Sequence, residues 1–372
     1  MIKKILHLGK FYPPDYGGIE SVTQSILDNS NKDFKHTVIC FAKNKEDSYI
    51  KSPNIIRCKP FVTIKNQPLS FKYLFEIVKR FNTSDIIHIH SPNILAYIAL
   101  IFCKNKNIIT HWHSDVLNKG NLYKIIRPIE TYMLKRSKYI IATSRKYADA
   151  SQPLKKFSSK IKIIPLGIKD LESSESKSLE SPVLKNIKTK KIILSVGRLV
   201  DYKGFDLILE AAKYFSKDIV SVIVGSGPEY NKLLELKNKN KIDNVYILQN
   251  ISNLERNYLY KKCDLFCLPS KNRQEAFGVV LLEALSSGKP ILSNIVQGSG
   301  MNWINKNNET GLNIDMKDSM NFANTINSLM IDKDQLHTFS RNSRHRYINK
   351  FTDKIMIANL EKLYYELFSS SK

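Results

Sequence analysis

The sequence predicts an α/β protein with two domains, each a doubly wound parallel β-sheet covered by helices. Its 372 residues exceed the length at which one hydrophobic core usually keeps growing. Short β-rich apolar runs alternate with helical patterns, and this βαβ rhythm occurs twice. Between the two series lie residues 169–190, a polar, Ser-rich and charged segment typical of an interdomain connection. With 42% hydrophobic and 25% charged residues, the chain can bury a sizeable core.

The first series of elements defines an N-terminal domain over residues 1–170. Its opening strand precedes a helical pattern from Ile19, and a later strand precedes the apolar helix 94–103. Such units place parallel strands side by side, so we expect one sheet with helices on both faces. The predicted strands cover residues 2–8, 37–41, 86–89, 108–110, 139–142 and 161–164.

The second series begins near Lys190 and defines a C-terminal domain over residues 190–352. Beyond Gly311 the pattern is helical to the end, and residues 353–368 carry apolar side chains at helical spacing. The predicted strands cover residues 192–196, 220–224, 245–248, 265–268 and 290–292, and the predicted helices begin at Phe205, Glu229 and Gly278 and after Asn253.

The charge balance favours anionic partners without choosing among them. A formal net charge of +24 suits polyanions, anionic lipid surfaces or phosphorylated substrates. A composition rich in Lys, Asn and Ile accounts for the same surplus equally well. The apolar stretch at the N-terminus is too short for a signal peptide, and residues 94–103 reach about half of the ~20 residues of a membrane span. We therefore expect a cytoplasmic protein that contacts the inner face of the cell membrane peripherally.

The cysteines predict neither disulfides nor a metal site. There are five, an odd number scattered through a large chain, which favours a reducing compartment. Cys263 and Cys267 lie in the apolar run CDLFCLP without a second Cys or His pair. We interpret them as buried strand cysteines rather than zinc ligands.

Two carboxylates in EAFGVVLLE form the first candidate site. Glu275 lies before the turn at Gly278, and Glu283 follows on the predicted helix. Both can face one crevice, where carboxylates accept hydroxyl groups of a sugar or ribose and stabilise positive charge at an anomeric carbon. Two solvated glutamates at a helix end would give the same spacing.

Two cations follow a strand in the segment VGRLVDYKGFD. Arg198 and Lys203 lie beyond the carboxyl end of the predicted strand 192–196. At such a place they can bind a diphosphate, Arg through bidentate hydrogen bonds and Lys as a point charge. A solubility role on the surface remains the alternative.

Two glycines follow the first strand and precede a helix. At Gly17 and Gly18 the backbone N–H groups can approach a phosphate at the helix N-terminus. The spacing is not a GxGxxG fingerprint. The segment GSGPE, residues 225–229, has the pattern of a generic strand-to-helix turn.

Histidines cluster at two strand ends, in HIHSP and in THWHSD. His88 and His90 alternate along a strand, so their rings share one face, as do those of His111 and His113. Because no acidic or Cys partner lies nearby in sequence, we expect no metal. We expect instead that His113 hydrogen-bonds the transferred sugar or the acceptor.

Taken in order, these motifs resemble the retaining glycosyltransferases of family 4, which have the GT-B fold of two Rossmann-like domains. The ordered set is the GG loop, HWHSD, GRLVDYKGFD, GSGPE and EAFGVVLLEALSSGKPIL, and it spans roughly residues 3–317. Its specific part is an R-x4-K element followed by an E-x7-E element. Each motif alone is weak, whereas the ordered set is specific.

The resemblance implies a role for each candidate residue. Gly17, Gly18, Arg198 and Lys203 would bind the diphosphate of a nucleotide-sugar donor, and Gly278 would begin the donor-binding helix. Glu275 and His113 would lie near the donor sugar as catalytic residues, and Glu283 would bind the ribose. No metal or other cofactor is implied. The mechanism implied is retention by front-face attack, in which the leaving phosphate helps to deprotonate the acceptor. The last helix, residues 353–372, would return to the N-terminal domain.

One segment departs from the family pattern. Where many relatives carry Gly-Gly-hydrophobic-Glu, this chain has Gly298-Ser299-Gly300-Met301. That variant resembles enzymes of bacterial surface polysaccharide synthesis, including O-antigen mannosyltransferases. It implies transfer of a hexose, with GDP-mannose as the candidate donor, to a glycan acceptor that is lipid-linked.

Two other functions compete with transfer. Residues 70–81 combine aromatic and basic side chains, which suits a nucleic-acid surface, a helix at a lipid interface or simple core packing. No nucleic-acid motif accompanies them, so we expect no nucleic-acid partner. A nucleotide-sugar epimerase or phosphorolytic enzyme of the same fold is the second alternative, but the chain lacks an evident acid pair suited to hydrolysis.

Overall fold

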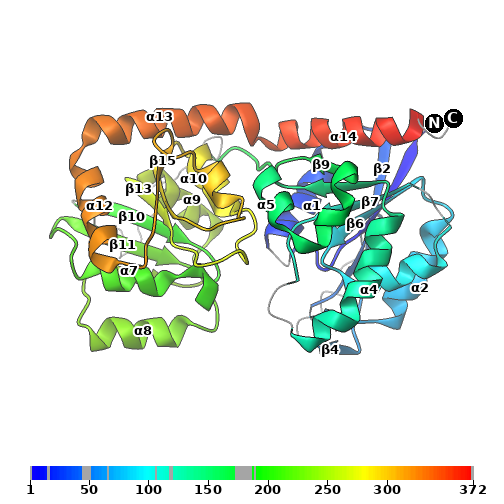
Figure 1. Ribbon diagram of the computed structural model, residues 1–372, viewed down its shortest axis with the longest axis horizontal. Helices are drawn as coiled ribbons and strands as arrows, with labels where there is room; N and C mark the ends of the chain where they lie inside the picture. Colours follow the sequence, from blue (N-terminus) through cyan, green and yellow to red (C-terminus); the bar gives the residue numbers. More distant parts are fainter. Residues whose placement is uncertain are drawn as a thin grey trace. The chain divides into compact units, whose positions relative to one another are not determined.

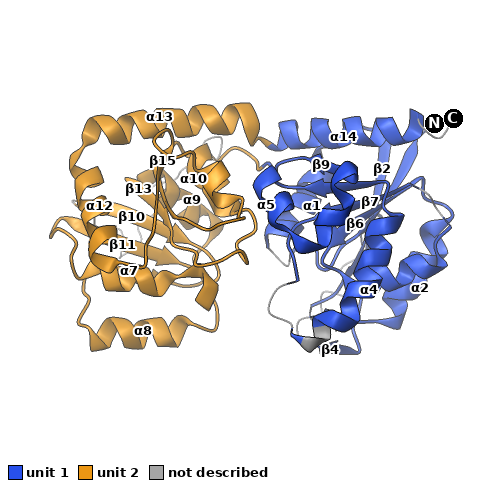
Figure 2. Ribbon diagram, viewed as in Figure 1, with its two compact units in different colours: residues 1–167, 353–372 blue, residues 168–352 orange. Residues whose placement is uncertain are grey.

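The computed structural model describes residues 2–14, 17–43, 52–64, 67–104, 107–116, 120–171, 187 and 190–369. The chain forms two compact units. Unit 1 comprises residues 1–167 and 353–372, and unit 2 comprises residues 168–352 (Figure 2). Of the connection expected over residues 169–190, positions 172–186 and 188–189 lie outside the described residues.

Unit 1 contains a parallel sheet of seven strands in the order β3-β2-β1-β6-β7-β8-β9. The strand order changes direction between β1 and β6. In doubly wound sheets such a switch point opens a crevice at the carboxyl ends of the strands. Neither β3 nor the small antiparallel hairpin β4–β5 was predicted from the sequence. The strands are β1 (Lys3–Leu8), β2 (Phe34–Phe41), β3 (Ile55–Cys58), β4 (Val62–Ile64), β5 (Gln67–Leu69), β6 (Ile86–Ser91), β7 (Ile108–Trp112), β8 (Tyr139–Ala142) and β9 (Ile161–Ile163).

Helices cover both faces of this sheet (Figure 1). On one face α1 packs against the C-terminal helix α14, whose buried Tyr364 hydrogen-bonds His88 of β6. The other face is covered by α2, α3 and α4, which contact one another in sequence. The helices are α1 (Gly18–Asn29), α2 (Phe71–Phe81), α3 (Ile94–Ala99), α4 (Asn121–Arg136), α5 (Arg145–Ala150) and α14 (Asp353–Ser369), with 3-10 turns η2 (Leu100–Phe102) and η3 (Gln152–Lys160).

Unit 2 contains a parallel sheet of six strands in the order β12-β11-β10-β13-β14-β15. Here the order changes direction between β10 and β13. Within α9, Ser252 and Glu255 form a capping box that fixes the first turn. The strands are β10 (Lys191–Val196), β11 (Ile219–Val224), β12 (Val245–Leu248), β13 (Leu265–Leu268), β14 (Ile291–Asn294) and β15 (Gly311–Ile314). The helices are α7 (Phe205–Ala212), α8 (Tyr230–Lys239), α9 (Asn253–Lys262), α10 (Val279–Ser286), α11 (Met301–Ile304), α12 (Ser319–Ile331) and α13 (Lys333–Lys350), with the 3-10 turn η4 (Asp201–Lys203).

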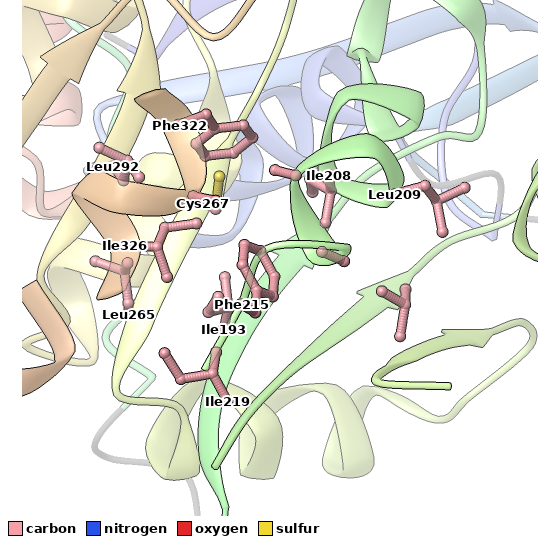
Figure 3. Packing of buried hydrophobic residues seen from close by; sticks show 14 of the residues in the cluster. Ile193, Ile208, Leu209, Phe215, Ile219, Leu265, Cys267, Leu292, Phe322 and Ile326 are labelled. Atoms are coloured by element: carbon pink, nitrogen blue, oxygen red, sulfur yellow. The ribbon is translucent and has the colours of Figure 1, made fainter. Parts of the chain in front are cut away.

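The core of unit 2 packs side chains of the sheet against α7 and α12. Ile193, Leu265 and Leu292, from three neighbouring strands, lie beside Phe322 and Ile326 of α12 (Figure 3).

Both cysteines of CDLFCLP are buried in unit 2. Cys267 lies on β13 within this core (Figure 3), and its thiol has a pKa raised by burial. Cys263 ends α9 and precedes the strand rather than lying in it, and burial raises its pKa to about 12. Both thiols therefore stay protonated near neutral pH.

Candidate active site

Two loops meet at the switch point of unit 2, the ones that follow β10 and β13. The first loop carries Arg198 and leads through η4 to Lys203, and the second carries Glu275 and leads to α10. These two strands pair directly, with Ile193 opposite Leu265. Their carboxyl ends therefore bring the R-x4-K and E-x7-E elements to one place, the switch point of the sheet.

A buried ion pair joins the two loops. Lys203 Nζ lies 2.5 Å from Glu275 Oε2, and the two residues are only 7% and 8% exposed. Burial acts to lower the pKa of the Lys203 ammonium, but attraction to Glu275 and the hydrogen bond between them outweigh it, so that pKa is raised. Lys203 therefore stays charged at neutral pH. This excludes the surface-solubility role considered for Lys203.

The pair leaves ligand-binding capacity on both partners. Ser270 Oγ donates to the same Oε2 atom at 3.0 Å. Within the described residues no hydrogen bond reaches Glu275 Oε1. An ammonium has three N–H donors, of which Glu275 accepts one. Lys203 can thus bind a further anion while Glu275 Oε1 accepts a hydroxyl group.

Arg198 differs from Lys203 in being exposed. It follows Gly197 at the end of β10, where the backbone of the next loop approaches closely. A Cβ atom on Gly225 would lie 1.8 Å from the carbonyl oxygen of Gly197, so only glycine fits there. The GSG turn of residues 225–227 thereby packs directly beneath the loop that carries Arg198.

Glu283 is held by α9 rather than by the Lys203–Glu275 pair. Tyr260 donates to Glu283 Oε2 at 2.6 Å, and Arg256 Nη2 lies 3.6 Å from Oε1. The Glu283 side chain is 15% exposed, and its charge contributes to the raised pKa of Lys203. The two glutamates thus have different partners, and Glu283 is not the freely solvated helix-end residue considered as an alternative.

Gly278 is the N-cap of α10 and has a φ of 90°. This left-handed conformation favours glycine and turns the chain sharply from the Glu275 loop into the helix. No side chain caps the first turn. Its backbone N–H groups, together with the positive end of the helix dipole, favour an anion at this position.

The segment that departs from the family pattern supports the Glu275 loop. Ser299 Oγ donates to the carbonyl oxygen of Glu275 at 2.5 Å, and Gly300 N–H donates to that of Ala276 at 2.8 Å. Arg273 Nε donates to the carbonyl oxygen of Gly298 at 3.2 Å. The Gly-Ser-Gly variant therefore fixes the position of the Glu275 backbone.

Unit 1 contributes the other predicted residues. Gly17 is the N-cap of α1 and Gly18 its first residue, one position earlier than the predicted helix start. Both glycines are exposed, and a Cβ atom on Gly17 would lie 2.5 Å from Glu20 Oε2. The neighbouring residues 15–16 lie outside the described residues. The helix N-terminus can accept an anion.

His113 follows β7, and Asp115 after it anchors the loop. Trp112 Nε1 and Ser151 Oγ donate to Asp115 Oδ1 at 2.9 and 2.6 Å. The backbone N–H of His113 donates to the carbonyl oxygen of Ser91 at 3.2 Å. His113 is 6% exposed, with its Nε2 atom 3.1 Å from His90 Nδ1. The imidazole is therefore held against another imidazole rather than an acid.

Six histidines form a buried layer on one face of this sheet, which α1 and α14 cover. The rings of His88 and His90 are stacked 4.7 Å apart, as their alternation predicted. The sequence interpretation missed His7 and His36. Parallel registration sets His7 opposite His88, a pairing that no local pattern reveals. We define the histidine layer as His7, His36, His88, His90, His111 and His113.

Burial keeps the histidine layer neutral. It lowers the pKa of His36 to about 4 and of His90 to about 3. It also lowers those of the other four well below the ordinary value, with further lowering by neighbouring imidazoles. At neutral pH each ring therefore has one N–H donor and one acceptor nitrogen.

Comparison with known structures identifies the fold class of this chain. The Anabaena protein HepE, crystallised in complex with UDP and glucose, matches with a TM-score of 0.80 at 19% identity, covering 98% of this chain and 100% of that one. Sucrose-phosphate synthase from Thermosynechococcus elongatus matches with a TM-score of 0.76 at 19% identity, covering 99% and 100%. The fold is that of the GT-B glycosyltransferases.

Family models match both units. Residues 16–170 match the model described as Glycosyltransferase Family 4, and residues 176–346 match Glycosyl transferases group 1. The two models together cover most of the chain, which belongs to the family 4 glycosyltransferases of the GT-B fold. It is 27% identical to O-antigen chain mannosyltransferase C of Escherichia coli, over 99% of both chains. It is 26% identical to the D-rhamnosyltransferase WbpZ of Pseudomonas aeruginosa, over 94% of this chain and 92% of that one.

Proposed function

We propose that this glycosyltransferase transfers a hexose from a nucleoside diphosphate sugar with retention of configuration and without a metal ion. The observation that carries the proposal is the buried Lys203–Glu275 pair at the switch point of unit 2. A charged ammonium and a carboxylate with an unused oxygen lie together there. The pair can bind the two chemically different parts of such a donor, its phosphate and its sugar.

The diphosphate is bound by Arg198 and Lys203. Arg198 is exposed at the end of β10, where its guanidinium can make bidentate hydrogen bonds to phosphate oxygens. Lys203 supplies a buried charge, which acts more strongly on a leaving phosphate than a solvated one would. Gly278 provides an additional anion site at the start of α10, and Gly17 and Gly18 provide one in unit 1. In unit 2, Arg198, Lys203 and the start of α10 take the role of the divalent cation that other transferases use.

In unit 2 the sugar is bound through Glu275, and in unit 1 His113 hydrogen-bonds the transferred sugar or the acceptor. Glu275 Oε1 accepts a sugar hydroxyl and stabilises positive charge developing at the anomeric carbon. Glu283, fixed by Tyr260, accepts a ribose hydroxyl. In front-face attack the bond from the anomeric carbon to the diphosphate breaks, and the acceptor oxygen bonds on the same face. The acceptor proton passes to the leaving phosphate.

The relatives suggest mannose from GDP-mannose as the transferred group and a lipid-linked surface glycan as the acceptor. One is an O-antigen chain mannosyltransferase, and the other transfers D-rhamnose. The Gly298-Ser299-Gly300 segment hydrogen-bonds the backbone of the Glu275 loop, and its sequence resembles that of enzymes of bacterial surface polysaccharide synthesis. We place the reaction at the cytoplasmic face of the membrane, where such acceptors are assembled.

An exposed apolar surface in unit 1 supports peripheral membrane contact. Phe71 and Phe75 of α2 are 76% and 64% exposed, whereas the helix is anchored through Tyr73, Ile77 and Phe81. Simple core packing of residues 70–81, considered from the sequence, therefore holds for one side of this helix and is wrong for Phe71 and Phe75. Lys72 and Lys79 are exposed on the same helix, and each basic residue near an anionic bilayer contributes ~1 kcal/mol. Among the helices in the described part of the chain, none is long and apolar enough to cross a membrane.

The test is a saturation-transfer NMR screen of GDP-mannose, GDP, UDP-glucose and UDP in the presence of EDTA. A signal from one donor and its nucleoside diphosphate is expected, and product analysis with that donor should give the retained anomer. An absence of binding by every nucleotide would overturn the proposal and favour the non-catalytic basic protein. Conversion of a donor without transfer would favour the epimerase.

A further inference from the structure

Four histidines of unit 1 form one continuous chain of hydrogen bonds. His36 Nδ1 lies 2.8 Å from His7 Nε2, His7 Nδ1 lies 3.1 Å from His90 Nε2, and His90 Nδ1 lies 3.1 Å from His113 Nε2. Every contact thus joins an Nδ1 atom to an Nε2 atom, in the same sense along the chain. We call these four residues the imidazole chain. It passes from β2 through β1 and β6 to the end of β7.

The contacts have the geometry of good hydrogen bonds. The ring centroids of the three successive pairs are 5.1, 5.4 and 5.4 Å apart. In each pair the distance between the centroids exceeds the N···N distance by the same amount. That amount equals the nitrogen-to-centroid distance of one ring added to that of the other. The two nitrogens and the two centroids therefore lie nearly on one line, as a strong N–H···N bond requires.

The same rings are poorly arranged for a metal ion. One nitrogen from each of His90, His111 and His113 lies within 4.8 Å of the other two, and His7, His88 and His90 form a second such group. However, His111 and His113 are stacked face to face at 4.1 Å, and His88 and His90 are parallel to within 3°. Lone pairs lie in the ring planes, so nearly parallel rings one beside the other do not readily direct their lone pairs to one ion. The geometry favours hydrogen bonding along the imidazole chain.

We propose that His36, His7 and His90 act as positioning residues that set the tautomer of His113 through the imidazole chain. A neutral imidazole has a single N–H group, so each contact can form only if one nitrogen is protonated and the other is not. Starting from either end, this leaves two patterns: all four rings protonated at Nδ1, or all four at Nε2. A mixed pattern would set two N–H groups or two lone pairs against each other.

Each end of the imidazole chain carries one nitrogen that is not used within the chain. His113 Nδ1 and His36 Nε2 are buried atoms that have no hydrogen-bond partner among the described residues. His36 also lines a cavity of about 450 Å³ together with Asp28 and Lys32. Conversion from the Nδ1 pattern to the Nε2 pattern takes one proton from water at His36 Nε2. It moves one proton across each of the three contacts and releases one from His113 Nδ1.

The functional consequence rests on the proposed function, because it takes His113 to contact the donor sugar or acceptor. In the Nδ1 pattern His113 donates a hydrogen bond from Nδ1 to a sugar oxygen, and in the Nε2 pattern it accepts one there. The imidazole chain thus links the tautomer of His113 to that of His36 on β2, three strands away in the sheet order. An enzyme that loses this control would bind its donor normally and turn over slowly.

The test is long-range ¹H–¹⁵N NMR of the full protein labelled at histidine nitrogens, which distinguishes the two neutral tautomers. Wild type should show one common tautomer at His7, His36, His90 and His113, with assignment by single substitutions. Two opposite neutral tautomers among these four would overturn the proposal. This readout needs no substrate, so its failure is distinguishable from failure of nucleotide binding in unit 2.

Substitution of His36, at the end of the imidazole chain opposite His113, provides a second test. His36→Leu should make the His113 tautomer mixed and lower kcat about tenfold or more with KM for the donor unchanged, because a wrong tautomer disables a positioned histidine. His36→Asn, whose side-chain amide can either donate or accept a hydrogen bond in the place of Nδ1, should restore both the single His113 tautomer and kcat. Tyr364→Phe is the matched control, because it removes the 2.6 Å bond to His88 within the same layer without touching the imidazole chain. Equal losses of kcat in His36→Leu and Tyr364→Phe, with an unchanged His113 tautomer, would overturn the proposal.

Discussion

Unit 1 and unit 2 each contain a parallel sheet with a switch point, but they bury different kinds of polar group. Unit 1 buries a neutral layer of six imidazoles under α1 and α14, whereas unit 2 buries the charged Lys203–Glu275 pair between two loops. The two kinds of buried group suit different ligand chemistry. A fixed cation suits the binding of a diphosphate, whereas a neutral imidazole offers one hydrogen-bond donor and one acceptor of defined direction.

The largest expected effect is selective loss of unit 1 stability in mild acid. The unfolded state binds a proton at each histidine below its ordinary pKa of 6.5, whereas the folded state does not until much lower pH, about 4 for His36. Stability is therefore full above pH 6.5 and is lost as the pH falls toward 4. Each such histidine lowers the free energy of unfolding by about 1.4 kcal/mol per pH unit in this window. The layer should therefore lower it by several kcal/mol at pH 5.5.

The chain offers a separate reporter for each unit in this experiment. It has two tryptophans, Trp112 on β7 of unit 1 and Trp303 on α11 of unit 2. Urea unfolding is followed by tryptophan fluorescence at pH 7.5 and 5.5. In Trp303→Phe the remaining Trp112 reports on unit 1, and in Trp112→Phe the remaining Trp303 reports on unit 2. Equal acid sensitivity of both transitions would show that the histidine layer is not its cause.

Lys203→Met should give the largest effect in unit 2. It leaves the Glu275 carboxylate buried without its cation, and breaking a buried pair costs roughly 3–5 kcal/mol. The Trp303 transition of this variant should move to lower urea concentration, with the Trp112 transition unchanged. Lys213→Met, which removes the exposed pair with Glu210, is the control and should leave both transitions nearly unchanged. A Lys203→Met protein as stable as this control would indicate that the pair is not buried in solution.

The sequence could predict what depends on local pattern. Strand–helix alternation gave both parallel sheets, and the spacing of His88 and His90 gave their common face. It could not predict features that depend on registration between distant segments. The contacts of His7 with His36 and His90 join three strands, and the partner of Glu283 is Tyr260 on another helix. The sequence signal for His7 was its place near a strand end, but its partner strand was unknown.

Chelation is expected to have the smallest effect. Excess EDTA should change neither turnover nor the Trp112 transition, because in the proposed mechanism Arg198 and Lys203 neutralise the leaving diphosphate in place of a metal ion. Loss of turnover that a divalent ion restores would contradict the metal-independent mechanism. A lower Trp112 transition in EDTA would instead indicate that the histidine layer binds a metal.

Calorimetric titration can show whether the R-x4-K element of unit 2 binds the donor diphosphate. The ligand is the nucleoside diphosphate of the donor found in the screen, and the proteins are wild type, Arg198→Ala and Lys213→Ala. Arg198 and Lys213 are both exposed cations of unit 2, so neither substitution should unfold the protein. We predict that Arg198→Ala weakens binding by ~10²-fold and that Lys213→Ala binds like wild type. Equal affinity in all three proteins would contradict the account.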